Sequence, residues 1–257
     1  MNSRLPNLIG WLEAERPDVA CLQELKARDE QFPARALLDL GYEAVWAGEH
    51  RWNGVAILSR IGAPIVTRRR LPGDTADRHS RYIEAAVSGV LVGCLYLPNG
   101  NPQPGPKFDY KLAWLDRLAS HAASLFHTTA PVVLAGDYNV VPTEADIYNS
   151  RSWKRDALLQ PEARAGFAAL LDQGWTDALR ERFPQDPPPW TFWQYFREAW
   201  PRDAGLRIDH LLLNQMAALN LTDAGVDRCV RGEPGASDHA PAWIDVNLAG
   251  RTRRPSS

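Results

Sequence analysis

The sequence predicts a single mixed α/β domain that contains many antiparallel strand pairs. Short apolar segments recur between turn-forming residues, amphipathic helices separate clusters of these segments, and no repeat or linker divides the chain. The 257 residues, 45% of them hydrophobic, suffice for one large buried core. We therefore expect one domain over residues 1–249 and a disordered basic tail over residues 250–257.

The first third of the chain predicts alternating helices and strands. Apolar side chains recur at helical spacing, ahead of the helix-stopping Pro17, at Leu5, Leu8, Ile9 and Leu12. A short, β-prone segment at residues 18–23 predicts a buried strand, and residues 32–40 predict a second helix. Further strands are expected between turn signals at residues 44–47, 54–59, 82–87 and 91–97.

The rest of the chain predicts two more helices and four more strands. Apolar residues repeat at a 4-3-4-3 spacing from Phe108 to Ala122, which predicts an amphipathic helix over roughly residues 107–126. Another helix is expected over residues 163–171, and the proline-rich segment 186–189 is too short for a domain boundary. The strands are expected at residues 131–135, 191–195, 208–213 and 242–246.

Composition excludes some classes of protein. The net charge of −2 gives no general attraction to nucleic acid, so any DNA site must be a local patch. Cys21, Cys94 and Cys229 lie apart in apolar segments and are expected to be buried thiols in a reducing compartment. No segment reaches the roughly 20 apolar residues of a membrane helix, and the polar N-terminus lacks a signal-peptide core. We expect a cytoplasmic protein without a membrane partner.

Polar side chains lie beside four apolar strands. They are Gln23-Glu24, Asp137-Tyr138-Asn139, Asp209-His210 and Ser237-Asp238-His239. A carboxylate at the end of a buried strand is costly unless it is paired or bound to a metal. Each group also has a structural interpretation, such as a helix cap at Glu24, a turn at Asp137, or a hydrogen-bonded core histidine at His239. Together they supply oxygen ligands, a base and a histidine with a carboxylate, which favours Mg²⁺ or Mn²⁺ over Zn²⁺.

These residues lie in eight ordered runs that resemble the exonuclease III branch of the endonuclease/exonuclease/phosphatase superfamily, which includes apurinic/apyrimidinic (AP) endonucleases. The runs are residues 22–26 (LQELK), 53–59 (NGVAILS), 81–84 (RYIE), 96–100 (YLPNG), 136–140 (GDYNV), 191–193 (TFW), 207–209 (RID) and 237–239 (SDH). The resemblance spans about residues 4–248 and implies a four-layer α/β/β/α sandwich. Two mixed sheets would lie face to face with helices outside, and the site would lie at one end.

The resemblance also implies a role for each site residue. Glu24 would be the principal metal ligand, and the other metal-site candidates are Asp137, Asn139 and Asp238. Asp137 would activate or orient the attacking water, which Asn139 would position. Asp209 would orient His239 against the scissile phosphate. Tyr96 and Asn99 would contact the same phosphate, and a divalent ion with a donating histidine would offset the developing negative charge.

Two further groups would bind the substrate. The stretch from Thr191 to Asp209 matches a pocket for a flipped abasic sugar, with candidates Phe192, Trp193, Leu206 and Ile208. Ordinary core packing is the alternative for the two aromatic residues. Arg81, Lys107 and Lys111 would bind DNA phosphates, with a solvated helix face as the alternative for the lysines.

The activity implied by the resemblance is Mg²⁺-dependent (or Mn²⁺-dependent) DNA repair. The enzyme would cleave double-stranded DNA 5′ to abasic sites, as a class II AP endonuclease, and degrade duplex 3′ ends with 3′-to-5′ polarity, as a monomer. Two alternatives stay open. One is another phosphodiesterase of the superfamily, such as an RNA-directed nuclease, and the other is a non-catalytic DNA-binding remnant. The remnant would fit the absence of the family's first-strand asparagine, but the presence of Glu24, Asp137, Asn139, Asp209 and His239 argues against it.

The N-terminus departs from the family pattern. Family members begin with a strand that ends in Trp-Asn-x-Asn-Ser, whereas Met1 lies next to the first predicted helix. We expect either a start site upstream of Met1 or a missing first strand. In the second case, unpaired strand backbone would lower stability and activity, at about 1–3 kcal/mol for each buried group.

Overall fold

The computed structural model describes residues 4–185 and 187–248. The predicted tail at 250–257, residue 186 of the proline-rich segment, and the three N-terminal residues lie outside this part. The first described element is α1 (Leu5–Glu15), which matches the first predicted helix. Among the described residues, no helix has both the length and the apolar character needed to cross a membrane.

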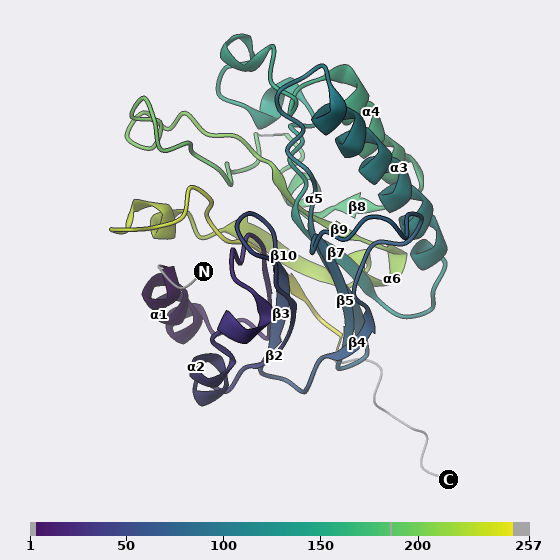
Figure 1. The fold of residues 1–257 in the computed structure, drawn as a ribbon, viewed down its shortest axis with the longest axis vertical. Helices are drawn as coiled ribbons and strands as arrows, with labels where there is room; N and C mark the ends of the chain where they lie inside the picture. Colours follow the sequence, from purple (N-terminus) through teal and green to yellow (C-terminus); the bar gives the residue numbers. More distant parts are fainter. Residues whose placement is uncertain (1–3, 186, 249–257) are drawn as a thin grey trace.

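A six-stranded sheet carries the centre of the domain. Its order is β4 (Ile65–Arg68), β5 (Tyr82–Val87), β6 (Val90–Tyr96), β7 (Val132–Asp137), β9 (Asp209–Leu213) and β8 (Thr176–Asp177). The sheet is mixed, because β6 and β7 are parallel and the other neighbours are antiparallel. Its outer face is covered by α3 (Pro106–Phe126) and α4 (Pro161–Asp172), which pack a core around Trp114, Leu134 and Phe167 (Figure 1).

Two smaller antiparallel sheets face the inner side of the large sheet. One has the order β1 (Val19–Leu22), β3 (Val55–Ser59) and β2 (Glu43–Ala47), and the other pairs β10 (Leu221–Val226) with β11 (Ala242–Val246). The first is covered outside by α1 and α2 (Ala34–Asp39), which completes four layers (Figure 1). The short helices are α5 (Ala178–Arg182), α6 (Gln215–Ala218), η2 (Asp29–Gln31), η3 (Glu144–Asp146), η4 (Ser150–Trp153) and η5 (Arg228–Gly232).

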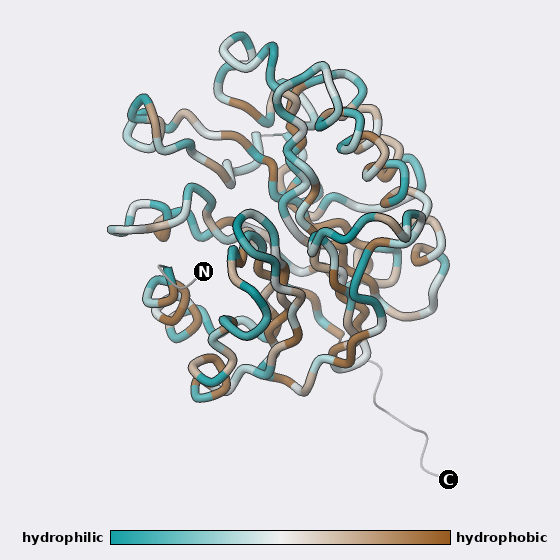
Figure 2. Tube along the Cα trace, viewed as in Figure 1, coloured by the Kyte–Doolittle hydropathy of each residue, from teal (hydrophilic) through white to brown (hydrophobic). Residues whose placement is uncertain are grey.

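Strand periodicity explains how the layers stack. Successive residues of a strand point to opposite faces of its sheet. In β3, Val55 and Ile57 join the core between the sheets, whereas Ala56 and Leu58 join the core under α1 and α2. All four are completely buried, so both faces of β3 are apolar from Val55 to Leu58. Figure 2 shows the same distribution, with hydrophobic residues concentrated on the strands and hydrophilic residues on the outer loops.

The structure corrects four expectations. Residues 191–195 do not form a strand, because Phe192 makes isolated bridges to Leu206 and His239. Strands β4, β8 and β10 were not predicted, since β4 and β8 are short and β10 contains the polar residues Thr222 and Asp223. The second mixed sheet is divided into the two antiparallel sheets described above, because no ladder among the described residues joins them. Cys229 is exposed rather than buried.

Candidate active site

Strand register places three predicted catalytic residues in one row across the large sheet. Tyr96 of β6 pairs with Asp137 of β7, and Asp137 pairs with Asp209 of β9. All three lie at the same end of the sheet, where these strands meet the loops. Adjacent strands are about 4.8 Å apart, so side chains far apart in the sequence become neighbours. Glu24 and His239 reach this row from loops that follow β1 and precede β11.

The turn after β7 holds Asp137 through two hydrogen bonds. The backbone N–H of Asn139 donates to Asp137 Oδ1 (2.8 Å), and Asn139 Nδ2 donates to Asp137 Oδ2 (3.0 Å). Asn139 adopts a left-handed backbone, with φ 49°. Gly136 is required before it, because a Cβ there would lie 1.9 Å from the carbonyl oxygen of Leu95. The GDYN sequence therefore forms the turn and also positions the carboxylate of the candidate site.

Burial makes Asp137 a stronger base than an ordinary carboxylate. It is 4% exposed, and desolvation raises its pKa to about 8, with Asp209 and Glu24 adding negative charge and His239 opposing the shift. A base with a pKa near neutrality is suited to taking a proton from water. Asn139 is equally buried, and its remaining bonds run to the carbonyl of Leu97 (2.9 Å) and from Asn99 Nδ2 (3.0 Å).

Asp209 and His239 form a carboxylate–imidazole pair. His239 Nδ1 lies 2.8 Å from Asp209 Oδ2, and both side chains are largely but not completely buried. Burial opposes the charge on the ring, but Asp209 and then Asp137 outweigh burial and raise the pKa of His239 to about 10. The ring is therefore an imidazolium at neutral pH, and its Nε2 side can donate to an anionic group.

Glu24 contributes a carboxylate from the smaller sheet. Its backbone is left-handed (φ 52°), and its side chain is 35% exposed. Tyr96 donates its hydroxyl hydrogen to Oε1, and Lys26 Nζ lies 2.7 Å from Oε2. Burial opposes the charge, but these two partners lower the pKa of Glu24. Lys26 was not predicted as a site residue, although it lies in the same LQELK motif.

The donor set fits a hydrated divalent cation better than a closed protein cage. Among the described residues, no three acidic, histidine or cysteine side chains gather around one point, so the four predicted ligands do not surround one ion. Both oxygens of Asp137 accept from Asn139, and Asn139 Oδ1 accepts from Asn99. Mg²⁺ commonly binds one or two carboxylates, several waters and substrate phosphate. The partly exposed Glu24 is suited to this mode, and Asp238 is half-buried beside His239.

The predicted phosphate-binding residues separate into two groups. Lys107 is exposed at the start of α3, and Arg81 stacks on Tyr96, with its guanidinium carbon 4.8 Å from the ring centre. Asn99 is also exposed. Lys111 is 0% exposed and donates to the backbone carbonyls of Asn99 and Asn139. The prediction that Lys111 touches DNA phosphate is therefore corrected, because its ammonium faces the protein interior.

The predicted apolar pocket is filled by its own side chains in this structure. Leu206 and Ile208 are 0% and 2% exposed, and Phe192 is half-exposed above them. Trp193 is completely buried and donates to Asp203 (3.0 Å), as the core-packing alternative predicted. Phe192 lies against His239, with ring centres 5.0 Å apart. Of these four residues, Phe192 is the one placed for direct contact with a substrate.

The sequence did not reveal a buried ionic network behind the row. Arg207 is 1% exposed and binds Asp146 (2.8 Å) and Asp177 (2.7 Å). Arg207 also donates to His210 Nδ1 (2.7 Å), which leaves His210 Nε2 to donate to the carbonyl of Val140 (3.0 Å). Burial lowers the pKa of His210 to about 4, so this ring is neutral. The one sign of this network in the sequence is the pair of polar residues, Asp209 and His210, at the start of the otherwise apolar strand β9.

Replacing Asp146 by asparagine should destabilise the fold. The variant leaves the buried Arg207 with less compensating charge, a change that costs about 3 kcal/mol in comparable buried pairs. Burial opposes ionisation of Asp146, but Arg207 outweighs it and lowers the pKa. The stabilisation is thus present above the unfolded-state pKa of about 4 and is lost as the pH falls. Urea unfolding at pH 7 measures it. Asp223→Asn, which affects an exposed pair with Arg182, should change little, and equal effects of the two would contradict the prediction.

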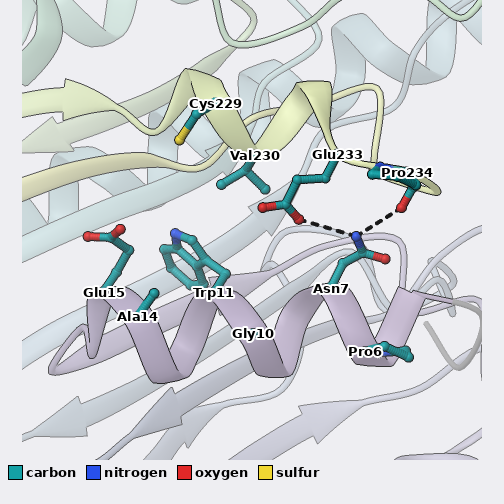
Figure 3. A pocket seen from close by; sticks show the side chains of 10 residues that line it. All are labelled: Pro6, Asn7, Gly10, Trp11, Ala14, Glu15, Cys229, Val230, Glu233 and Pro234. Atoms are coloured by element: carbon teal, nitrogen blue, oxygen red, sulfur yellow. Dashed lines mark hydrogen bonds between the residues drawn. The ribbon is translucent and has the colours of Figure 1, made fainter.

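A hollow of about 580 Å³ lies away from this row. It separates α1 from the turn around η5 and is lined by residues such as Trp11 and Cys229 (Figure 3). Asn7 bridges it by donating to Glu233 (3.4 Å) and to the carbonyl of Pro234 (3.2 Å). None of the predicted site residues lines it, so the catalytic row and this hollow are separate features.

Comparison with known proteins agrees with this geometry. Residues 2–239 match the Endonuclease/Exonuclease/phosphatase family. Exodeoxyribonuclease III of Haemophilus influenzae is 31% identical, over 95% of this chain and 96% of that protein. The solved 3′-5′ exonuclease NExo from Neisseria meningitidis is 38% identical, with a TM-score of 0.92 and 96% coverage of each chain. An AP endonuclease from Archaeoglobus fulgidus is 31% identical, with a TM-score of 0.91, over 96% of this chain and 95% of that one.

Proposed function

Because this chain belongs to the endonuclease/exonuclease/phosphatase family, we propose that it is a DNA-repair nuclease. It hydrolyses the phosphodiester bond 5′ to an abasic site, leaves a 3′-hydroxyl, and also removes nucleotides from duplex 3′ ends. The observation that carries the proposal is the row of Tyr96, Asp137 and Asp209, with His239 held against it. This row combines a base, an imidazolium and a tyrosine at one end of the sheet.

The proposed mechanism assigns a proton or a charge to each residue. Asp137 accepts a proton from the attacking water, and Asn139 holds that carboxylate in place through two hydrogen bonds. His239, kept cationic by Asp209, donates to an oxygen of the scissile phosphate. The Tyr96 hydroxyl, which donates to Glu24, would contact the same phosphate. Nucleases of this family depend on a divalent metal, and Mg²⁺ held by Glu24 would offset negative charge on the phosphate and the leaving oxygen.

The substrate class is supported by relatives of two kinds. Solved proteins of similar fold include a 3′-5′ exonuclease and an AP endonuclease. In this chain, Phe192 is a partly exposed aromatic residue beside His239, where it can pack against a sugar that lacks its base. Half-buried Arg81 and exposed Lys107 supply positive charge for the DNA backbone. Three unpaired cysteines fit a reducing cytoplasm, and we propose a monomer.

Metal-dependent incision of abasic DNA is the direct test. A duplex with one tetrahydrofuran abasic analogue should be cut 5′ to the analogue in Mg²⁺ and left intact in EDTA. Electrophoresis with both strands labelled gives the position of the cut. An RNA of the same sequence serves as the matched substrate, because the family also includes nucleases of other specificity. Faster cleavage of the RNA, or cutting that persists in EDTA, would contradict the proposal.

The balance between the two DNA activities is a separate measurement. Leu206 and Ile208 of the predicted pocket are almost completely buried, so both activities would meet the substrate at the half-exposed Phe192. The test is to compare incision at the analogue with 3′-to-5′ degradation of a duplex that has a recessed 3′ end, using the same enzyme preparation. Degradation without incision would restrict the function to 3′-end processing.

A further inference from the structure

Lys111 is a buried cation that joins two loops of the catalytic face. It lies on α3, is 0% exposed, and donates from Nζ to the carbonyl oxygens of Asn99 (3.1 Å) and Asn139. Asn99 follows β6, and Asn139 follows β7. The side chains of these two asparagines are hydrogen-bonded as well, through Asn99 Nδ2 and Asn139 Oδ1 (3.0 Å). One ammonium thus links the backbones of two residues whose side chains already touch.

The burial of this ammonium needs an explanation. A buried charge without partners is strongly unfavourable, so it persists where hydrogen bonds and opposite charge compensate it. Two carbonyls compensate Lys111 directly. Burial lowers the pKa of Lys111 to about 7, and the charges of Asp137 and Asp156 oppose this shift. A hydrophobic side chain would avoid this cost. The buried ammonium therefore destabilises the fold, and its presence is explained better by the two loop carbonyls to which it donates.

The glycine of the YLPNG motif makes room for the lysine. Gly100 has a left-handed backbone (φ 91°), and a Cβ added there would lie 2.7 Å from Lys111 Cδ. Such a contact forces the lysine stem to move. Gly100 and Lys111 are thus a fitted pair within the protein interior, 11 positions apart in the sequence.

The same loop is held at two more successive carbonyls. His210 Nε2 donates to the carbonyl of Val140 (3.0 Å), and Arg164 Nε donates to that of Val141 (2.9 Å). With Lys111 on Asn139, three basic side chains from α3, β9 and α4 hold three consecutive carbonyls. The held segment directly follows Asp137, whose carboxylate depends on the left-handed Asn139 for both of its hydrogen bonds.

We propose that Lys111 is a positioning residue for phosphodiester hydrolysis, which holds Asn139 and Asn99 in register so that Asp137 faces the attacking water. The proposal rests on the function proposed above. This positioning role takes the place of the direct contact with DNA phosphate that the sequence predicted for Lys111. A positioning residue affects turnover, because errors of about 1 Å can lower the rate by about 10²-fold. A phosphate contact would instead affect affinity and its dependence on salt.

Lys111→Met separates these two roles. We expect kcat for abasic DNA to fall by about 10- to 100-fold, while the Kd for the same duplex in EDTA stays unchanged. The slope of log Kd against log salt should also stay unchanged. If Lys111 instead contacted a phosphate, the slope would decrease by about 0.9. Lys107→Met, one turn earlier on α3 and exposed, is the matched variant and should weaken binding and reduce that slope. Arg35→Met, on the exposed face of α2, controls for the loss of one charge.

A second variant retains the charge and moves the lysine. Gly100→Ala places a Cβ against Lys111 and should lower kcat without altering the salt slope. Gly89→Ala is its control, because Gly89 has a similar backbone (φ 85°) and nothing within 4 Å of an added Cβ. Both substitutions carry the same backbone strain. Equal kcat values for the two alanine variants would overturn the proposal.

Hydrogen exchange provides a readout that needs no substrate. In Lys111→Met, amide exchange should become faster in residues 97–101 and 137–141, relative to Arg35→Met, while the strands exchange as in the wild type. Unchanged exchange in both segments, or a changed salt slope with normal kcat, would overturn the positioning role. A wild-type protein that cuts no DNA would instead refute the proposed function, and the exchange experiment would still decide whether Lys111 holds the two loops.

Discussion

Asp137→Asn is expected to lower kcat for abasic DNA by about 10²- to 10⁴-fold, the range associated with loss of a general base. Asp137 accepts from two donors of Asn139, the backbone N–H and Nδ2. An asparagine at position 137 brings an amide NH₂ against one of these donors. The variant thus loses the base and disturbs the turn that aims it. Single-turnover cleavage of the tetrahydrofuran duplex in Mg²⁺ measures the loss.

Stability distinguishes this prediction from general damage to the fold. Burial raises the pKa of Asp137, so folding favours its neutral form, and its charge destabilises the folded state as the pH rises above the unfolded-state pKa. Removing the charge should therefore offset the hydrogen bond lost from Asn139, and the Tm at pH 8 in EDTA should change little. Asp116→Asn, on the exposed face of α3, is the control for a lost carboxylate. A variant that loses its activity only together with its Tm would contradict a catalytic role for Asp137.

The second large effect is a shift in pH dependence when Asp209 is replaced by asparagine. Asp209 keeps the pKa of His239 near 10, so the wild-type imidazolium persists through neutral and mildly alkaline pH. Without the carboxylate, the pKa should return toward about 6.5. Turnover by Asp209→Asn should then fall as the pH rises above that value, and the deficit at pH 8 should reach roughly 10²- to 10³-fold.

Two controls define the cause of this shift. Asp209→Glu keeps a carboxylate near His239 and should retain more of the alkaline activity. His239→Gln has no ring to titrate, so its residual activity should lack the new decline between pH 6 and 8. NMR titration of the His239 ring in EDTA gives the pKa directly. A wild-type His239 that is already neutral at pH 7.5 would contradict the assigned role.

Several elements could be predicted from the sequence because their signals are local. The helix predicted over residues 107–126 corresponds to α3 (Pro106–Phe126), and the strand at residues 242–246 corresponds to β11. In these segments the apolar period matches one type of secondary structure along its whole length. The strand predicted at residues 191–195 was wrong, because their aromatic side chains suit a strand while their backbone pairs through isolated bridges.

The candidate site was predictable where a chemically costly residue follows an apolar strand. Glu24, Asp137 and Asp209 stand out for this reason, and the ordered motifs around them identified the family. Burial was harder to infer, as Lys107 and Lys111 show. The two lysines lie one turn apart on one helix, yet Lys107 is exposed and Lys111 is completely buried. The loops after β6 and β7 accept hydrogen bonds from Lys111 and cover it, whereas Lys107 stays exposed.

The sequence by itself thus determined the fold class and the family, and it supplied the candidate catalytic residues. Only the tertiary structure decided that Tyr96, Asp137 and Asp209 lie in one row, because register depends on pairing between distant strands. It also decided that Lys111, His210 and Arg164 hold the carbonyls of residues 139–141. A carbonyl is present at every position of the chain and leaves no mark in the sequence. Only the packing of the layers decides which carbonyl each of these donors meets.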